Sequence, residues 1–78
     1  MEYKVYQVIA DRIEYKPDMD GIYYESYEDF FNDLFPSRVS AIRKAQKLAS
    51  RFDCYVRVLL VKITERGKER GQIVYRKH

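Results

Sequence analysis

Hydrophobic and polar residues alternate along two stretches of the chain, as they do in strands that bury one face. Residues 3–15 are rich in Val, Ile and Tyr, and residues 54–64 place apolar side chains at every other position. In the second half of 54–64 both sets of alternate positions are apolar, which predicts a central strand or one whose second face meets another surface. Shorter returning strands are expected at residues 22–24 and 72–76, each after a turn or loop rich in Gly and charged residues.

A longer period marks residues 38–52, where apolar side chains recur three and four positions apart and basic side chains occupy the opposite face. This spacing predicts an amphipathic helix with Ser37 as its N-cap. A second, shorter helix is expected over residues 27–34, because Ser26 stands three residues before Asp29, as in a capping box.

These elements predict one α+β domain over residues 1–78 with the order β-β-α-α-β-β. The long helix is expected to cover one face of a small, three- to four-stranded, mainly antiparallel sheet. The domain then has an acidic, aromatic-rich lobe (16–35), a basic-faced amphipathic helix (37–52) and a C-terminal hairpin (54–76).

Cysteine and histidine are scarce in this 78-residue chain, which has Cys54 alone and His78 alone. An intramolecular disulfide is therefore impossible, and no Cys or His cluster predicts a metal site or a cofactor. Cys54 lies on an apolar strand without a partner base, which is typical of an inert core thiol, so we expect no enzyme activity. Because small domains often need an added source of stability, a homodimer is the expected one.

The N-terminal residues lack a basic region followed by a long apolar segment, and the longest apolar run is residues 58–61. The sequence therefore predicts neither a signal peptide nor a membrane span, and we expect a cytoplasmic protein without membrane contact.

Charge divides the chain into two halves of opposite sign. Residues 1–35 hold nine acids and three bases, whereas residues 36–78 hold twelve bases and three acids. A segregation of this size creates surfaces of opposite potential, which steer partners rather than determine the fold.

The acidic half offers a candidate protein-binding surface, because its tyrosines exceed what a small core needs and interface centres are enriched in aromatic anchors. The plain alternative is that these aromatic side chains fill the core and the acids face water. The candidate residues are Tyr23, Tyr24, Tyr27, Glu28, Asp29 and Phe31.

The basic half offers a candidate nucleic-acid interface, because regularly spaced Lys and Arg on a rigid helix can neutralise several phosphates. Its plain alternative is a solvated helix face and a solvated loop. The candidate residues are Arg43, Lys44, Lys47, Arg51, Arg66, Lys68 and Arg70.

The sequence favours a non-enzymatic module that binds a protein partner, with nucleic-acid binding as the alternative. A chain of this size and composition suits a regulatory or inhibitor-like protein of the kind that phages encode.

Overall fold

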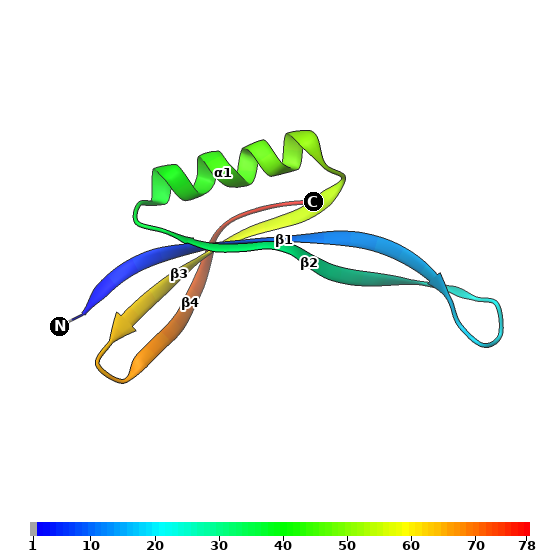
Figure 1. The fold of residues 1–78 in the computed structure, drawn as a ribbon, viewed down its shortest axis with the longest axis horizontal. Helices are drawn as coiled ribbons and strands as arrows, with labels where there is room; N and C mark the ends of the chain where they lie inside the picture. Colours follow the sequence, from blue (N-terminus) through cyan, green and yellow to red (C-terminus); the bar gives the residue numbers. More distant parts are fainter. Residues whose placement is uncertain (1) are drawn as a thin grey trace.

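The computed structural model describes residues 2–78, which form one four-stranded antiparallel sheet and one helix (Figure 1). In chain order the elements are β1 (Tyr3–Pro17), β2 (Tyr23–Phe35), α1 (Arg38–Arg51), β3 (Cys54–Thr64) and β4 (Gly67–Lys77). The strands lie in the order β2-β1-β3-β4, so β2 and β4 are the outer strands. The predicted α+β class, with a helix over an antiparallel sheet, is confirmed, but the order is β-β-α-β-β with a single helix.

The short helix predicted over residues 27–34 is wrong, because this segment is part of β2 and pairs with β1. The register shifts at the step from Ala10 to Asp11, so that Phe30 is an extra, bulged residue of β2. Phe30 and its neighbour Phe31 both pack against the core beneath the helix. Adjacent apolar residues on one side break the alternation of a strand, and this explains the wrong prediction.

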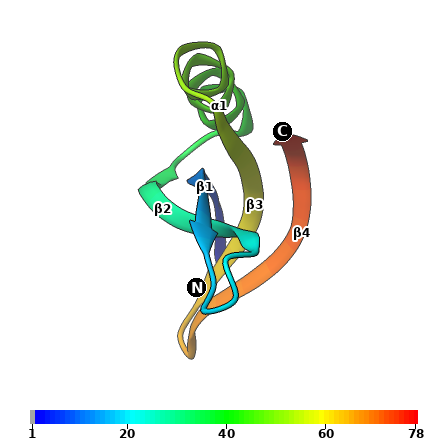
Figure 2. The same cartoon turned by 90° about the vertical axis from the view of Figure 1, so that its right-hand side faces the viewer.

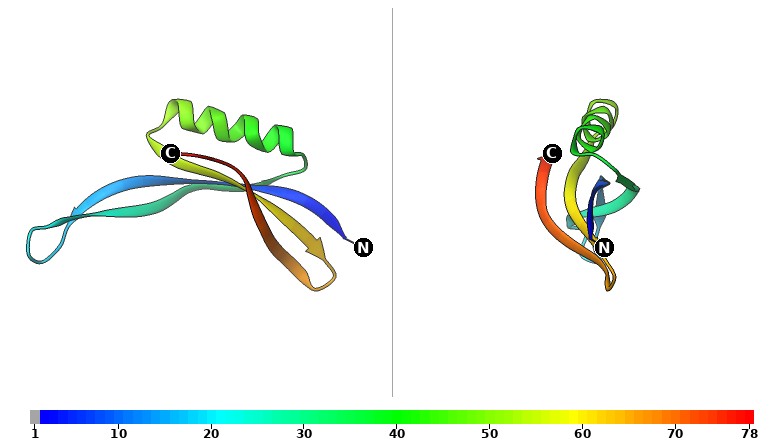
Figure 3. Two further views of the ribbon diagram at one scale, coloured as in Figure 1. Left: turned by 180° about the vertical axis from the view of Figure 1, so that it is seen from behind. Right: turned by 90° about the vertical axis from the view of Figure 1, so that its left-hand side faces the viewer.

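The first hairpin is far longer than the returning strand expected at residues 22–24. β1 and β2 remain paired up to Pro17 and Tyr23, next to the turn. The outer part of this hairpin projects past the C-terminal end of α1 (Figures 1 and 3). Residues 16–35 are therefore not a separate packed lobe, and we call the projecting residues 12–28 the arm.

The second hairpin has a tight turn in place of the charged loop expected over residues 65–71. Thr64 pairs directly with Gly67, so most of the expected loop belongs to β4. Gly67 has a φ of 122°, a conformation that residues with a Cβ rarely adopt, and this permits the close reversal.

The predicted long helix and its N-cap are confirmed. Ser37 has extended backbone angles, and its side-chain oxygen accepts a hydrogen bond of 3.1 Å from the backbone N–H of Ser40. Ala41, Ala45 and Leu48 form the buried stripe of α1, which lies against β1 and β3. Two of these side chains are methyl groups, so the helix can approach the centre of the sheet closely.

Apolar residues are buried on both faces of the sheet. Beneath the helix, the first cluster joins the α1 stripe to Val8 and Ala10 of β1 and to Val56 and Val58 of β3. Cys54 belongs to this cluster, and its thiol lies 3.7 Å from the carbonyl oxygen of Leu48. The predicted core position of this cysteine is confirmed.

A second cluster lies on the opposite face, which carries no helix. It consists of Ile9, Leu59 and Val61, with Val5 and Ile63 packed against it. Val61 is only 1% exposed within the single chain, so this residue needs no second subunit to cover it. The strands bend and twist strongly (Figure 2), which brings side chains of one face together.

Within residues 2–78, no helix has the length and the apolar character that spanning a bilayer requires.

We expect Leu48→Ala to lower the free energy of unfolding by about 2–5 kcal/mol, because it opens a cavity between α1 and the sheet. The exposed neighbour Lys47→Ala provides the control and should change the free energy of unfolding by no more than about 0.5 kcal/mol. Urea denaturation of both variants measures the two values. Equal losses would contradict the packing of α1 described above.

Candidate functional site

The arm presents apolar side chains to solvent instead of burying them. Tyr15 and Tyr23 are 66% and 69% exposed, and Met19 and Ile22 at the tip are exposed as well. The Asp18 carboxylate orders the tip by accepting two hydrogen bonds of 2.9 Å from backbone N–H groups. The arm is thus a well-defined hairpin with a surplus of exposed aromatic side chains.

Three of the arm tyrosines lie on one face. Tyr15 of β1 lies directly opposite Glu25 of β2, so these two side chains point to the same side of the sheet. Tyr23 and Tyr27 are each two residues from Glu25, and alternate residues of a strand share a face, so they point to that side as well. This is the helix-free side of the sheet. We call Tyr15, Tyr23 and Tyr27 the tyrosine row. Tyr24 points to the opposite side.

The predicted protein-binding residues are therefore divided between several surroundings. Tyr23 and Tyr27 belong to the tyrosine row, whereas Tyr24 and Glu28 alternate onto the other face. Asp29 lies opposite Asp11 at the base of the arm.

Phe31 lies away from the exposed tyrosines, although the sequence placed it with them. It packs against the core beneath α1, and the Lys44 ammonium lies 5.1 Å from its ring centroid. We therefore leave Phe31 out of the exposed surface.

The predicted nucleic-acid-binding residues fall into two separate groups. The side chains of Arg43, Lys47 and Arg51 are exposed on α1, and that of Lys44 is half-buried over the ring of Phe31. Lys68 and Arg70 lie opposite Ile63 and Val61, and they therefore share the helix-free face. Arg66 is in the turn between β3 and β4. The structure thus does not join the seven residues into one basic surface.

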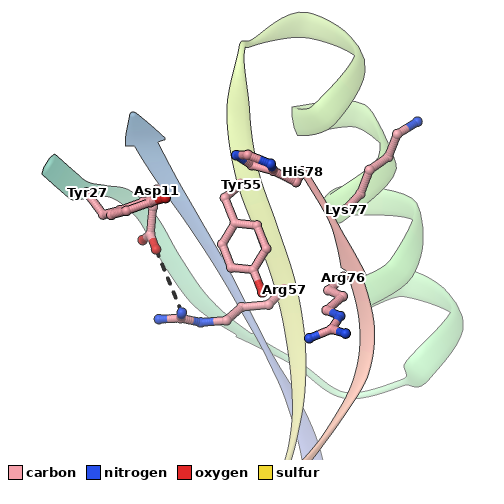
Figure 4. A pocket seen from close by; sticks show the side chains of 7 residues that line it. All are labelled: Asp11, Tyr27, Tyr55, Arg57, Arg76, Lys77 and His78. Atoms are coloured by element: carbon pink, nitrogen blue, oxygen red, sulfur yellow. Dashed lines mark ion pairs between the residues drawn. The ribbon is translucent and has the colours of Figure 1, made fainter. Parts of the chain in front are cut away.

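A pocket at the base of the arm was missed by the sequence analysis. It has a volume of about 750 Å³ and lies on the helix-free side, between the arm and the end of β4 (Figure 4). The residues that line it are Asp11, Tyr27, Tyr55, Arg57, Arg76, Lys77 and His78. The volume lies within the usual range of small-molecule sites.

Asp11 is the unusual residue of this pocket, because its carboxyl is buried without enough hydrogen bonds or ion pairs to offset the loss of water. Asp11 is 5% exposed, and its Oδ1 atom has no hydrogen-bond partner among the described residues. Its Oδ2 atom lies 3.8 Å from Nη1 of Arg57, which is a loose ion pair. One signal could have identified the residue, since Asp11 interrupts the apolar alternation of Ile9 and Ile13.

Burial, followed by the neighbouring carboxyl of Asp29, raises the pKa of Asp11 from 3.8 to about 6. The guanidinium of Arg57 opposes this shift but does not cancel it. A buried carboxylate with an unsatisfied oxygen destabilises a fold, and such groups are found disproportionately at functional sites.

Two further features bear on the chemistry of the site. Burial, followed by the nearby carboxylates of Asp53 and Asp11, raises the pKa of the Cys54 thiol, which disfavours the reactive thiolate. Within residues 2–78 no group of three or more His, Cys, Asp or Glu side chains is placed to hold a metal ion. The pocket offers hydrogen-bonding and stacking groups for a ligand, without a nucleophile paired to a base.

Comparison of the chain with protein-family models, with curated protein sequences and with solved structures found no match.

We expect Asp11→Asn to remove a pH-dependent loss of stability. The folded chain holds the Asp11 proton more tightly than the unfolded chain, so the contribution of this group to stability falls as the pH rises from about 4 to above 6. Each pKa unit corresponds to about 1.4 kcal/mol, which makes the loss by pH 7 about 3 kcal/mol. Urea denaturation of both proteins at several pH values measures this. The stability of the wild type relative to the variant should decrease between pH 4 and pH 7, and a constant difference would contradict the assignment.

Proposed function

We propose that the protein is a non-enzymatic binding module that engages a protein partner through the tyrosine row of its arm. The observation that carries this proposal is the exposure of Tyr15, Tyr23 and Tyr27 on one face of a projecting hairpin. Tyrosine supplies a large contact area at a low cost in side-chain entropy, and it is enriched at the centres of interfaces. These three side chains cover no part of the core.

The charge of the arm favours a partner with a basic border. Residues 12–28 carry the acids Glu14, Asp18, Asp20, Glu25 and Glu28 against two bases. The Tyr27 hydroxyl donates a hydrogen bond of 2.7 Å to Glu25, which holds an acid within the row. Acids around an aromatic centre favour Lys and Arg on the facing surface and repel the phosphates of a nucleic acid.

Nucleic-acid binding remains the second candidate. It is favoured by the exposed basic side chains of Arg43, Lys47 and Arg51 along a single helix. The basic residues of the β3–β4 hairpin cannot add to that surface, because Lys68 and Arg70 share the opposite face.

The double variant Tyr15→Ser, Tyr23→Ser tests the proposal, with Tyr24→Ser as its matched control on the other face. All three side chains are exposed, so the substitutions should leave the thermal midpoint nearly unchanged. In pull-downs from a nuclease-treated lysate, we expect the double variant to lose a partner protein that the wild type and Tyr24→Ser retain. With the purified partner, the double substitution should weaken binding at least about tenfold.

A triple variant, Arg43→Gln, Lys47→Gln, Arg51→Gln, separates the two candidate functions. If a protein is the partner, this variant should retain it. Captured material that disappears on nuclease treatment and in the triple variant, but persists in the tyrosine double variant, would overturn the proposal in favour of nucleic acid.

A further inference from the structure

The pocket at the base of the arm has two chemically different ends. On the side of β1 and β2 lie Asp11 and Tyr27, with Asp29 paired opposite Asp11. On the side of β4 lies the guanidinium of Arg76, whereas the side chain of Lys77 extends away from the pocket (Figure 4). A ligand that fits this arrangement has hydrogen-bond donors at one end and a negative charge at the other.

The acidic end lacks a donor. Oδ1 of Asp11 is buried and has no hydrogen-bond partner among the described residues, although a satisfied carboxylate oxygen accepts at least one hydrogen bond. Figure 4 shows Asp11 between Tyr27 and Tyr55, with its carboxyl group directed toward Arg57. The carboxyl of Asp29 can share a proton with Asp11, but as a carboxylate it has no hydrogen to donate. A ligand that donates an N–H group to Oδ1 would therefore satisfy this atom.

The carboxylate of Asp11 offers hydrogen-bond acceptors directly beside the hydrogen-bond donors of the Arg57 guanidinium. The 3.8 Å between Oδ2 and Nη1 places a carboxylate beside a guanidinium on the pocket floor. Guanine is complementary to such a pair, because its N1–H and N2–H donors lie next to its O6 acceptor. Carboxylates accept from base N–H groups, and arginine donates to O6 and N7 of guanine.

The aromatic walls fit the flat faces of a base. Tyr55 lies directly opposite Asp11 across β1 and β3, and Tyr27 lies opposite Ile13, two residues farther along β1. Side chains at these register positions share one face, so both rings lie on the side of the carboxyl, and the Arg57 guanidinium lies over the Tyr55 ring, 5.9 Å from its centroid. Stacking on tyrosine is a common way of holding an unpaired base.

From these features we propose that the pocket binds a guanine nucleotide, with the base on Asp11 and Arg57 between the two tyrosines and the phosphate toward Arg76. The ligand is either a free nucleotide or an unpaired guanosine within a single strand. This inference goes beyond the proposed protein-binding function, whose test uses Tyr15, Tyr23 and Tyr24, none of which lines the pocket.

Titration calorimetry of the full chain with nucleoside monophosphates tests the base assignment. Guanosine monophosphate should bind about tenfold or more tightly than inosine monophosphate, which lacks only the 2-amino donor, and than uridine monophosphate. Equal affinities for these three nucleotides, or no binding of any of them, would overturn the proposal. This comparison uses the wild type alone and does not depend on the folding of a variant.

Two substitutions test which end of the pocket holds the base and which holds the phosphate. Asp11→Asn should abolish the preference for guanosine over inosine monophosphate, whereas Asp20→Asn, the same change at the exposed tip of the arm, should preserve it. Arg76→Gln should weaken the binding of guanosine monophosphate but leave that of guanosine unchanged. If Asp11→Asn retains the full preference, or if Arg76→Gln weakens both ligands equally, the proposed orientation is wrong.

A short oligouridine with one central guanosine distinguishes the two sources of the base. Tighter binding of this oligomer than of free guanosine monophosphate would assign the site to single strands. Weaker binding would assign it to the free nucleotide. An all-uridine oligomer that binds as well as the guanosine oligomer would overturn the proposal, because the base would then make no contribution.

Discussion

The difference in length between the helix and the strand beneath it shapes this molecule. A helix of 14 residues such as α1 is about 21 Å long, whereas a strand of 15 residues such as β1 extends for about 50 Å. One helix can therefore cover only part of β1 and of the hairpin to which it belongs. The buried contacts of Ala41, Ala45 and Leu48 fix the helix over the middle of the sheet, and the rest of the hairpin projects without cover.

The candidate surfaces arise where that cover ends. Phe30 marks the boundary between the covered part of the sheet and the arm. Its ring centroid lies 5.4 Å from that of Phe52 at the end of α1, and the arm begins beyond this contact. On the reverse side of the same boundary, the sheet carries Asp11 beside Arg57. A small domain has little stability to spare, so a buried carboxyl with an unsatisfied oxygen is a substantial cost. Such a cost is understandable where the group binds a ligand.

The sequence predicted correctly the elements in which apolar residues recur with a single regular spacing, either that of a helix or that of a strand. The helix with its Ser37 cap, the strand from Cys54 to Thr64 and the core position of Cys54 are confirmed. The second strand was predicted only at its start, because the bulge at Phe30 places neighbouring residues on one side and imitates helical spacing. Likewise, Tyr23, Tyr24 and Tyr27 were identified as candidates but Tyr15 was not, because the register of the hairpin decides which tyrosines share a face. The pocket could not be predicted, because it joins residues of all four strands through pairings that are distant in the sequence.

The outer strands of the sheet carry opposite charges, and this has a consequence for its open edges. β2 holds Glu25, Glu28, Asp29 and Asp33 without a base, whereas β4 holds Lys68, Arg70, Arg76 and Lys77 with one acid. If two copies extended the sheet about a two-fold axis, β2 would meet β2, or β4 would meet β4, and like charges would face each other. Electrostatic repulsion therefore protects each edge from symmetrical aggregation, and this protection weakens as added salt shortens the screening length.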